Sequence, residues 1–323
     1  MRTRRTEILL NTVKVTLAAT IAILIAMLLR LNYAVSAGVI AMLSIQPTKK
    51  ETVKTAVERV LAFATSLLIA YLCFFVVGYE IGAFALFIFL FVFVCYAFKW
   101  NGSITLNVVL ISHILESENM LPATVLNEVL IFAIGVCAGV IANMHLRKNV
   151  GAIEDLKEKT DEQIRKILVG MSQHILEGDA SDYNRASFDL LDNYIRDAKN
   201  MAAANYGNQF RRADKYDIEY INMREKQCQI LYEMYKLVRH MHQKPITAKR
   251  ISEFLNKVST EYHQANKVDK LLQEFHDLDD SMKSAPLPKE RTEFEDRAKL
   301  FILLRLLEEF LELKKDFVKE FLD

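Results

Sequence analysis

Glu128 is the side chain of this sequence that could most readily do chemistry. It lies inside the apolar stretch 122–144, and an ionisable group at membrane depth is costly enough to be a functional candidate by default. On a helical wheel it falls near the same stripe as Gly135 and Gly139, whose spacing permits close packing of helices. The pattern therefore predicts a carboxylate that faces the interior of a helical bundle. The alternative is an interfacial carboxylate in a helix that starts later.

Uncharged polar side chains and one histidine lie in two further apolar stretches. We expect Asn32, Ser36 and Gln46 on one face of a span at 33–46, where they could line a cavity. In the stretch 102–115, Asn107 and His113 are candidates for substrate contact or for hydrogen bonds between helices. Lys14 is a weaker candidate, because it is close enough to the end of its span to snorkel to the membrane surface.

Other kinds of chemistry lack support in the sequence. It contains neither GxxxxGK[ST] nor GxGxxG, so no nucleotide-phosphate cradle and no ATP motor are predicted. His240 and His242 point to different helix faces and are accompanied by no HExxH motif or cysteine pair, so we expect no metal site. Without paired carboxylates or a Ser/His arrangement, the sequence predicts a protein that is not an enzyme and that needs no cofactor.

The elements that must position these residues are apolar stretches of helical length. A bilayer core needs about 20 apolar residues in a helix. The most economical interpretation is six such stretches, which are 8–29, 33–46, 60–78, 81–98, 102–115 and 122–144. The second and the fifth are short enough to pack inside the bundle. Beyond residue 150 the periodicity predicts five amphipathic helices, which are expected at about 151–177, 181–206, 212–242, 247–280 and 289–322.

Charge divides the chain into two parts. Of its 323 residues, the first 150 carry 12 of the 41 Lys and Arg residues and 7 of the 40 Asp and Glu residues. We predict an all-α protein in which a six-helix transmembrane bundle at 1–147 precedes a soluble, elongated helical bundle at 148–323. The net charge of +1 argues against a nucleic-acid partner.

The basic residues of the first part predict its orientation. With six spans, one side of the membrane carries only Arg30, and the other side carries ten basic residues, which are Arg2, Arg4, Arg5, Lys49, Lys50, Lys54, Arg59, Lys99, Arg147 and Lys148. Cytoplasmic loops are enriched in Lys and Arg. Both termini are therefore expected in the cytoplasm. A cleaved signal peptide is the less favoured alternative, because the first apolar stretch is too long.

One segment resembles a known family. The span that ends Ser44-Ile45-Gln46-Pro47-Thr48, the basic link 49–54 and Arg59 at the start of the next span are similar to the bacterial aromatic acid exporter family. Its members of this size resemble the whole chain, with six spans and a cytosolic helical domain. The resemblance implies a multi-pass protein of the bacterial plasma membrane that exports aromatic or other weak organic acids.

Physical reasoning adds expectations of mechanism, and the larger relatives add one of assembly. An exported anion needs a cationic or donor-rich site, for which Arg59 is a candidate, and proton coupling through Glu128 is the simplest energy source without an ATP motif. Larger relatives resemble two six-span units in one chain, so a homodimer is a way to complete the path. Its contact could use the stripe of Gly135 and Gly139 or the helix at 289–322, unless that helix is buried in its own bundle. The competing hypothesis is a membrane-anchored helical interaction or scaffold protein without transport activity.

Overall fold

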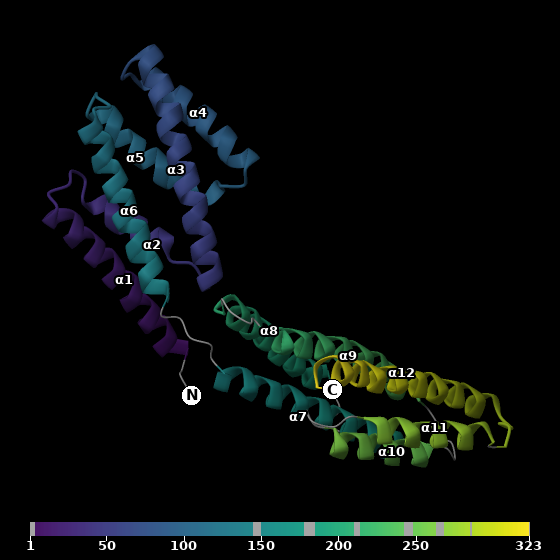
Figure 1. Cartoon of the computed structure of the whole chain (residues 1–323). Coiled ribbons are helices and arrows are strands. Elements are labelled where there is room, and N and C mark those ends of the chain that lie inside the picture. Colours follow the sequence, from purple (N-terminus) through teal and green to yellow (C-terminus); the bar gives the residue numbers. More distant parts are fainter. Residues whose placement is uncertain are drawn as a thin grey trace. The chain divides into compact units, whose positions relative to one another are not determined.

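The chain folds into two compact helical units (Figure 1). The computed structural model describes residues 4–144, 150–177, 185–209, 214–241, 248–262, 268–284 and 286–322. The first unit comprises 1–148 with 207–213, and the second comprises 149–206 with 214–323. Every regular element in the described ranges is a helix, as the sequence predicted. The predicted boundary at 147/148 lies outside the described residues.

Six α-helices run back and forth through the first unit. They are α1 (Arg4–Leu28), α2 (Val35–Ser44), α3 (Lys49–Val77), α4 (Ile81–Ala97), α5 (Ile104–Glu116) and α6 (Pro122–Met144). Among the described residues, three helices are long and apolar enough to cross a membrane, namely α1, α3 and α6, while α2 and α4 are shorter apolar helices. Six spans therefore remain a prediction for this unit, and a membrane location rests on the three longer helices.

The second helix is shorter than the stretch 33–46 predicted for it, and this corrects the expected polar face. Asn32 precedes α2, in a turn where Arg30 and Tyr33 have φ of 54° and 60°. Gln46 follows the helix and precedes Pro47, which disfavours helical backbone in the residue before it. Of the three residues expected to share a helical face, only Ser36 is in α2.

Small residues bring α2 and α6 into close contact. A Cβ atom built on Gly135 would lie 2.7 Å from the carbonyl oxygen of Ala37, and one built on Gly139 would lie 2.7 Å from that of Ala41. The stripe predicted to permit close packing is therefore covered by α2 of the same chain. Because this glycine face is buried, it is not the surface that a second copy would contact.

Thr48 is the N-cap residue of the long helix α3. Its side chain accepts a hydrogen bond from the backbone N–H of Glu51 at 3.3 Å, so it satisfies one of the donors that a helix start leaves free. The spacing Thr-x-x-Glu is typical of a helix start. Pro47 and this cap together separate α2 from α3 within a few residues.

The second unit is an elongated bundle of amphipathic helices. Its elements are α7 (Val150–Glu177), α8 (Arg185–Gly207), α9 (Tyr216–Arg239), α10 (Ala248–Glu261), α11 (Asp269–Lys283) and α12 (Arg291–Phe321). The single helix expected at 247–280 was wrong, because α10 and α11 are separate helices and Val268 before α11 has a φ of 67°, outside the helical region. The last helix buries one face in its own unit, including Leu304, Leu307 and Phe310.

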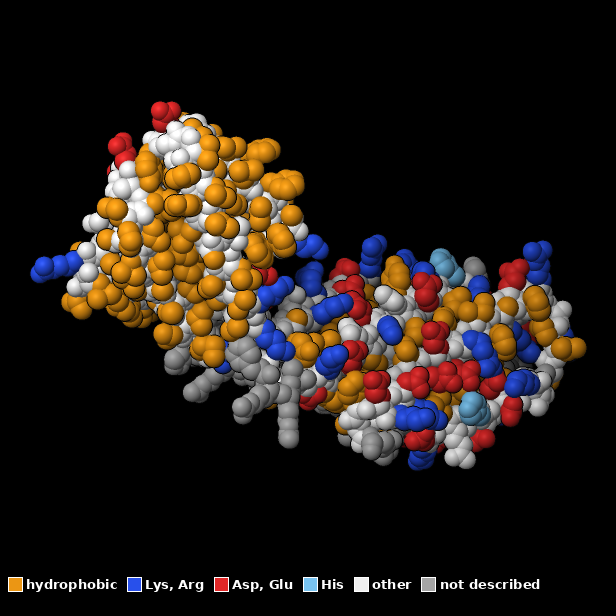
Figure 2. Space-filling view, turned by 45° about the horizontal axis from the view of Figure 1, so that its top comes forward, with side chains coloured by type: hydrophobic (Ala, Val, Ile, Leu, Met, Phe, Trp, Pro, Cys, Tyr) orange, Lys and Arg blue, Asp and Glu red, His pale blue; other side chains and the backbone are white. Residues whose placement is uncertain are grey.

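The two units present different surfaces, as Figure 2 shows for one face. Hydrophobic side chains cover the first unit, whereas Lys, Arg, Asp and Glu alternate over the second. Exposed apolar side chains of the first unit include Leu28, Phe75, Phe89 and Phe93. An apolar surface of this extent is expected where lipid replaces water.

Candidate functional site

A carboxylate and an imidazole form a buried pair inside the first unit. His113 Nδ1 lies 2.8 Å from Glu128 Oε2, and only 9% of His113 and 1% of Glu128 is exposed. His113 is three residues before the end of α5, and Glu128 is near the start of α6. Because α5 and α6 are joined by a short connection, the two side chains meet at the same end of the bundle.

Asn127, Ser36 and Tyr33 surround this pair. Asn127 donates a hydrogen bond from Nδ2 to Glu128 Oε1 at 2.9 Å. Ser36 Oγ lies 3.4 Å from His113 Nε2, and the Tyr33 ring stacks on the imidazole with centroids 4.0 Å apart. We call Glu128, His113, Asn127 and Ser36 the acidic cluster. Each polar atom of the Glu128 carboxylate thus has a partner.

Arg59 occupies the opposite part of the bundle. Only 3% of Arg59 is exposed. Its Nη1 donates to Ser44 Oγ at 2.6 Å and its Nη2 donates to the Leu43 carbonyl at 2.8 Å, so it binds the last turn of α2. Its Nε–H has no hydrogen-bond partner. The guanidinium therefore has a buried donor that remains to be satisfied.

Lys14 and Asn143 form a further polar group near the end of α2. Lys14 Nζ donates to Asn143 Oδ1 at 3.0 Å, while Asn143 Nδ2 donates to Thr52 Oγ1 at 2.5 Å and to the Gln46 carbonyl at 2.8 Å. Lys14 was expected to snorkel, but its ammonium instead turns inward to an amide on α6. We call Lys14, Arg59, Ser44, Asn143 and Thr52 the basic cluster.

Packed apolar side chains separate the two clusters. Phe63 and Phe132 stack with ring centroids 4.4 Å apart, and each is 5% exposed. They belong to a buried group that includes Ala37, Ile40 and Leu110. Phe63 follows Arg59 by four residues on α3, and Phe132 follows Glu128 by four residues on α6. The ring pair therefore lies one helical turn from Arg59 along α3 and one helical turn from Glu128 along α6.

The structure brings together some of the residues singled out in the sequence and separates others. Ser36, His113 and Glu128 meet in the acidic cluster. The side chain of Asn32 is exposed, and only its backbone contributes, through two hydrogen bonds with the Asn127 amide. Gln46 likewise contributes its carbonyl, while its side chain donates to the Leu43 carbonyl. Asn107 is buried away from both clusters, where its Nδ2 donates to the Ser103 carbonyl.

Sequence reasoning missed Asn127, Ser44, Thr52 and Asn143. A signal was available for Asn143, which follows Gly139 by four residues and so continues the buried stripe of α6. The spacing of the other three carries no comparable signal. Their roles depend on which helices become neighbours.

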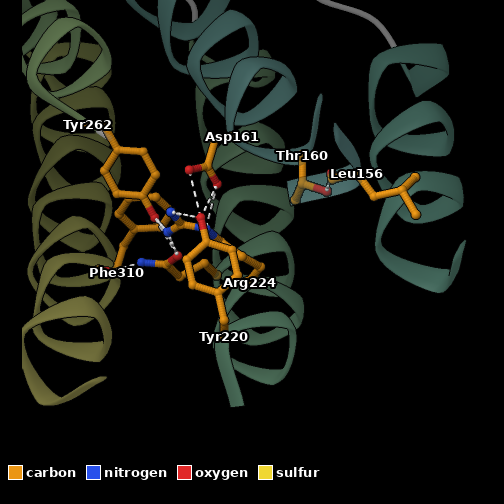
Figure 3. Close-up of polar contacts among 8 residues, drawn as sticks. Leu156, Thr160, Asp161, Tyr220, Arg224, Tyr262 and Phe310 are labelled. Atoms are coloured by element: carbon orange, nitrogen blue, oxygen red, sulfur yellow. Dashed lines mark hydrogen bonds and ion pairs between the residues drawn. The ribbon is translucent and has the colours of Figure 1, made fainter. Parts of the chain in front are cut away.

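A third buried polar cluster lies in the second unit (Figure 3). Arg224 is fully buried and donates to Asp161 Oδ1, to Tyr220 Oη and to Gln227 Oε1, each at 2.8 Å, and also to Tyr262 Oη. Gln227 in turn donates to the Phe310 carbonyl at 2.7 Å. The cluster therefore ties α7, α9 and α12 together. Since its donors and acceptors satisfy one another, we interpret it as structural.

The fold and the buried clusters define a class of protein. Apolar helices that enclose a carboxylate–imidazole pair and a separate buried guanidinium are typical of membrane proteins that move ions or polar solutes. Two models of protein families match the sequence and identify the family within this class. The family model "Aromatic acid exporter family member 1" matches residues 6–146, and the model "Putative aromatic acid exporter C-terminal domain" matches residues 151–315. The chain belongs to the aromatic acid exporter family, a family of membrane transporters.

Similar proteins are known from two bacteria. "Uncharacterized protein YqjA" of Bacillus subtilis strain 168 is 28% identical over 307 residues, which are 95% of each chain. A crystal structure of a "putative membrane protein" from Clostridium difficile 630 is 28% identical, with a TM-score of 0.48 over 52% of this chain and 98% of that one.

Proposed function

We propose that this protein exports weak organic acids, aromatic acids among them, across a bacterial plasma membrane and that an inward proton gradient drives the export. In this proposal six helices cross the membrane and both termini lie in the cytoplasm. The basic cluster then faces the cytoplasm, where the substrate is loaded. The acidic cluster lies toward the outside, where protons enter. Membership of an exporter family supports the direction and the substrate class.

The Glu128–His113 pair is the observation that carries the proposal. A carboxylate that is 1% exposed within apolar helices is expensive, and its oxygens are held by an imidazole and an amide. A protein whose helices served only as an anchor for a scaffold would have no need of such a pair. The pair therefore favours transport over the interaction hypothesis.

The chemistry of the pair suits the transfer of one proton. With a neutral imidazole, His113 donates from Nδ1 to the carboxylate, and the pair carries one negative charge. Uptake of a proton, by either partner, makes the pair neutral, as a carboxylic acid beside an imidazole or as an imidazolium–carboxylate ion pair. Release of the proton on the other side restores the charge. Each cycle would thus exchange a proton for an organic anion.

Glu128→Gln tests this role. The amide keeps the size and much of the hydrogen bonding of the carboxylate but cannot take up a proton. In proteoliposomes with an imposed proton gradient, we expect gradient-driven export of benzoate to be lost. Exchange of labelled for unlabelled benzoate, which needs no net proton movement, should persist at about the wild-type rate.

Glu80→Gln is the matched control, because Glu80 is an exposed carboxylate at the start of α4. We expect this variant to export benzoate as the wild type does. Gradient-driven export by Glu128→Gln at the wild-type rate would refute proton coupling through this residue.

A further inference from the structure

Arg59 carries a charge that no described side chain neutralises. Its hydrogen bonds go to a hydroxyl and to a backbone carbonyl, both uncharged, and its Nε–H has no partner. Among the described residues no carboxylate forms an ion pair with it, and the neighbouring Glu58 on α3 pairs with Lys54 instead. An ion buried without a counter-ion is strongly unfavourable. The arrangement therefore calls for an anion.

An aromatic surface lies one turn away from this cation. Phe63 follows Arg59 on the same face of α3, and its ring stacks on that of Phe132 from α6. One helical turn rises about 5.4 Å. That spacing suits a molecule in which a carboxylate is attached directly to a ring or through one or two atoms.

We propose that Arg59 and the Phe63–Phe132 pair form the binding position for an aromatic carboxylate. The guanidinium binds the carboxylate through its free Nε–H, and the ligand's ring stacks on one of the two phenyl rings. This assignment rests on the proposed transport function and names the residues that select its substrate. In the structure described here the two rings contact each other and close the apolar layer between the clusters. Binding separates them, because the ligand's ring takes the place of one stacking partner.

The position explains why the cation and the proton-accepting pair are apart. Arg59 and Glu128 lie on opposite sides of the ring pair, each one turn from it. An anion on Arg59 is thus kept away from the negative charge of the acidic cluster by apolar side chains. When the rings separate, the ligand becomes the link between the two clusters.

Direct binding to the purified full-length protein tests the assignment without a gradient. Titration calorimetry would compare benzoate with cyclohexanecarboxylate, which keeps the charge but lacks the aromatic ring. We expect Arg59→Gln, which removes the charge but keeps an amide donor, to weaken benzoate binding about tenfold or more, since a charge-assisted hydrogen bond is lost. Phe63→Leu and Phe132→Leu should weaken benzoate binding but leave cyclohexanecarboxylate binding unchanged.

Lys54→Gln is the matched control, because Lys54 is an exposed cation on the same helix, pairs with Glu58 and lies outside the basic cluster. We expect it to bind benzoate as the wild type does. Wild-type affinity in Arg59→Gln, an equal loss in both cation variants, or no binding of benzoate to the wild type would overturn the assignment.

Transport assays keep the two proposals distinguishable. If the wild type exports benzoate under a proton gradient but Arg59→Gln binds it normally, the binding position is wrong and export stands. If the wild type binds benzoate in the expected pattern but a gradient drives no export, the binding position stands and the proposed function is wrong. A folded Arg59→Gln variant is verified by its melting temperature in detergent.

Discussion

Lys314 shows how burial changes the chemistry of a single residue. It lies on α12, is 1% exposed, and places its ammonium 4.4 Å from the centre of the Tyr262 ring. Burial, and to a smaller extent the positive charge of Arg224, lowers the pKa of Lys314 from 10.5 to about 7, although Asp161 opposes the change. The lysine therefore changes its charge near the pH of the cytoplasm, in the unit that we place there.

This shift predicts a pH dependence of stability. Between pH 7 and pH 10.5 the unfolded chain holds a proton on Lys314 that the folded chain has released, so stability rises with pH in this window. From pH 7 to pH 9 the gain is about 2 kcal/mol. Hydrogen exchange of α9 and α12 peptides, corrected for intrinsic rates, should show growing protection over this range.

Lys314→Met removes the titrating group and should flatten that dependence. Lys319→Met is the control, because Lys319 is exposed on the same helix. If Lys314→Met retained the wild-type pH dependence of protection, Lys314 would not be its source.

At the scale of single residues, the sequence predicted positions within helices better than partners between them. Glu128 was recognisable because a carboxylate stands out in an apolar stretch and shares a stripe with glycines. Its pairing with His113 was not predictable, because it depends on how α5 and α6 are joined and turned. The buried Asp161–Arg224 pair likewise looks, in sequence, like any two charges of a soluble helix.

At the scale of elements, the packing of α2 on α6 depends on two glycines of α6, Gly135 and Gly139, which have no side chain to separate the helices. A Cβ atom at position 135 would lie 2.5 Å from Ile40 Cβ and 2.7 Å from the carbonyl oxygen of Ala37. Since backbone cannot move aside easily, Gly135→Ala should destabilise the first unit by about 1–3 kcal/mol. The expected result is a lower melting temperature of the protein in detergent.

Gly82→Ala provides the comparison, because a Cβ atom there would meet nothing within 4 Å. Its melting temperature should stay the same or rise slightly, since alanine favours helix over glycine by up to about 1 kcal/mol. Equal melting temperatures for the two variants would show that the contact at position 135 is not tight.

Helix positions were predictable from hydrophobic period and from breakers such as Pro47, whereas two boundaries were not. No proline or glycine marks the interruption between α10 and α11. Val268 adopts a left-handed conformation there despite its branched side chain. The late start of α2 also lacks such a signal, because Arg30 and Tyr33 have positive φ in the turn before it although neither is a glycine. Neither feature carries a proline or glycine signal in the local sequence.

At the scale of the whole molecule, the orientation in the membrane remains a prediction that labelling can test. The four native cysteines are first replaced by alanine, and a single cysteine is then introduced as Glu80→Cys or as Lys54→Cys. Position 80 lies between α3 and α4, and position 54 lies near the start of α3. Because basic residues concentrate on the cytoplasmic side, an impermeant thiol reagent added to intact cells should label position 80 and not position 54.

Membranes turned inside out provide the reverse measurement, in which position 54 should be labelled and position 80 protected. Labelling of position 80 from the cytoplasmic side alone would invert the proposed topology. It would also place the acidic cluster, rather than the basic cluster, at the side where substrate is loaded.

The length of α2 has a consequence for the surrounding lipid. Ten residues rise about 15 Å, which is half of a hydrocarbon core of about 30 Å. The exposed face of α2 is nevertheless apolar, with Val35, Val39 and Met42 along it. In the proposed six-span arrangement, acyl chains beside this helix would have to compress, and the elastic cost of that mismatch would grow with bilayer thickness. In that arrangement the protein would be best accommodated by thin, easily deformed membranes, and the lipid composition of the cell would be one of the quantities that set its stability.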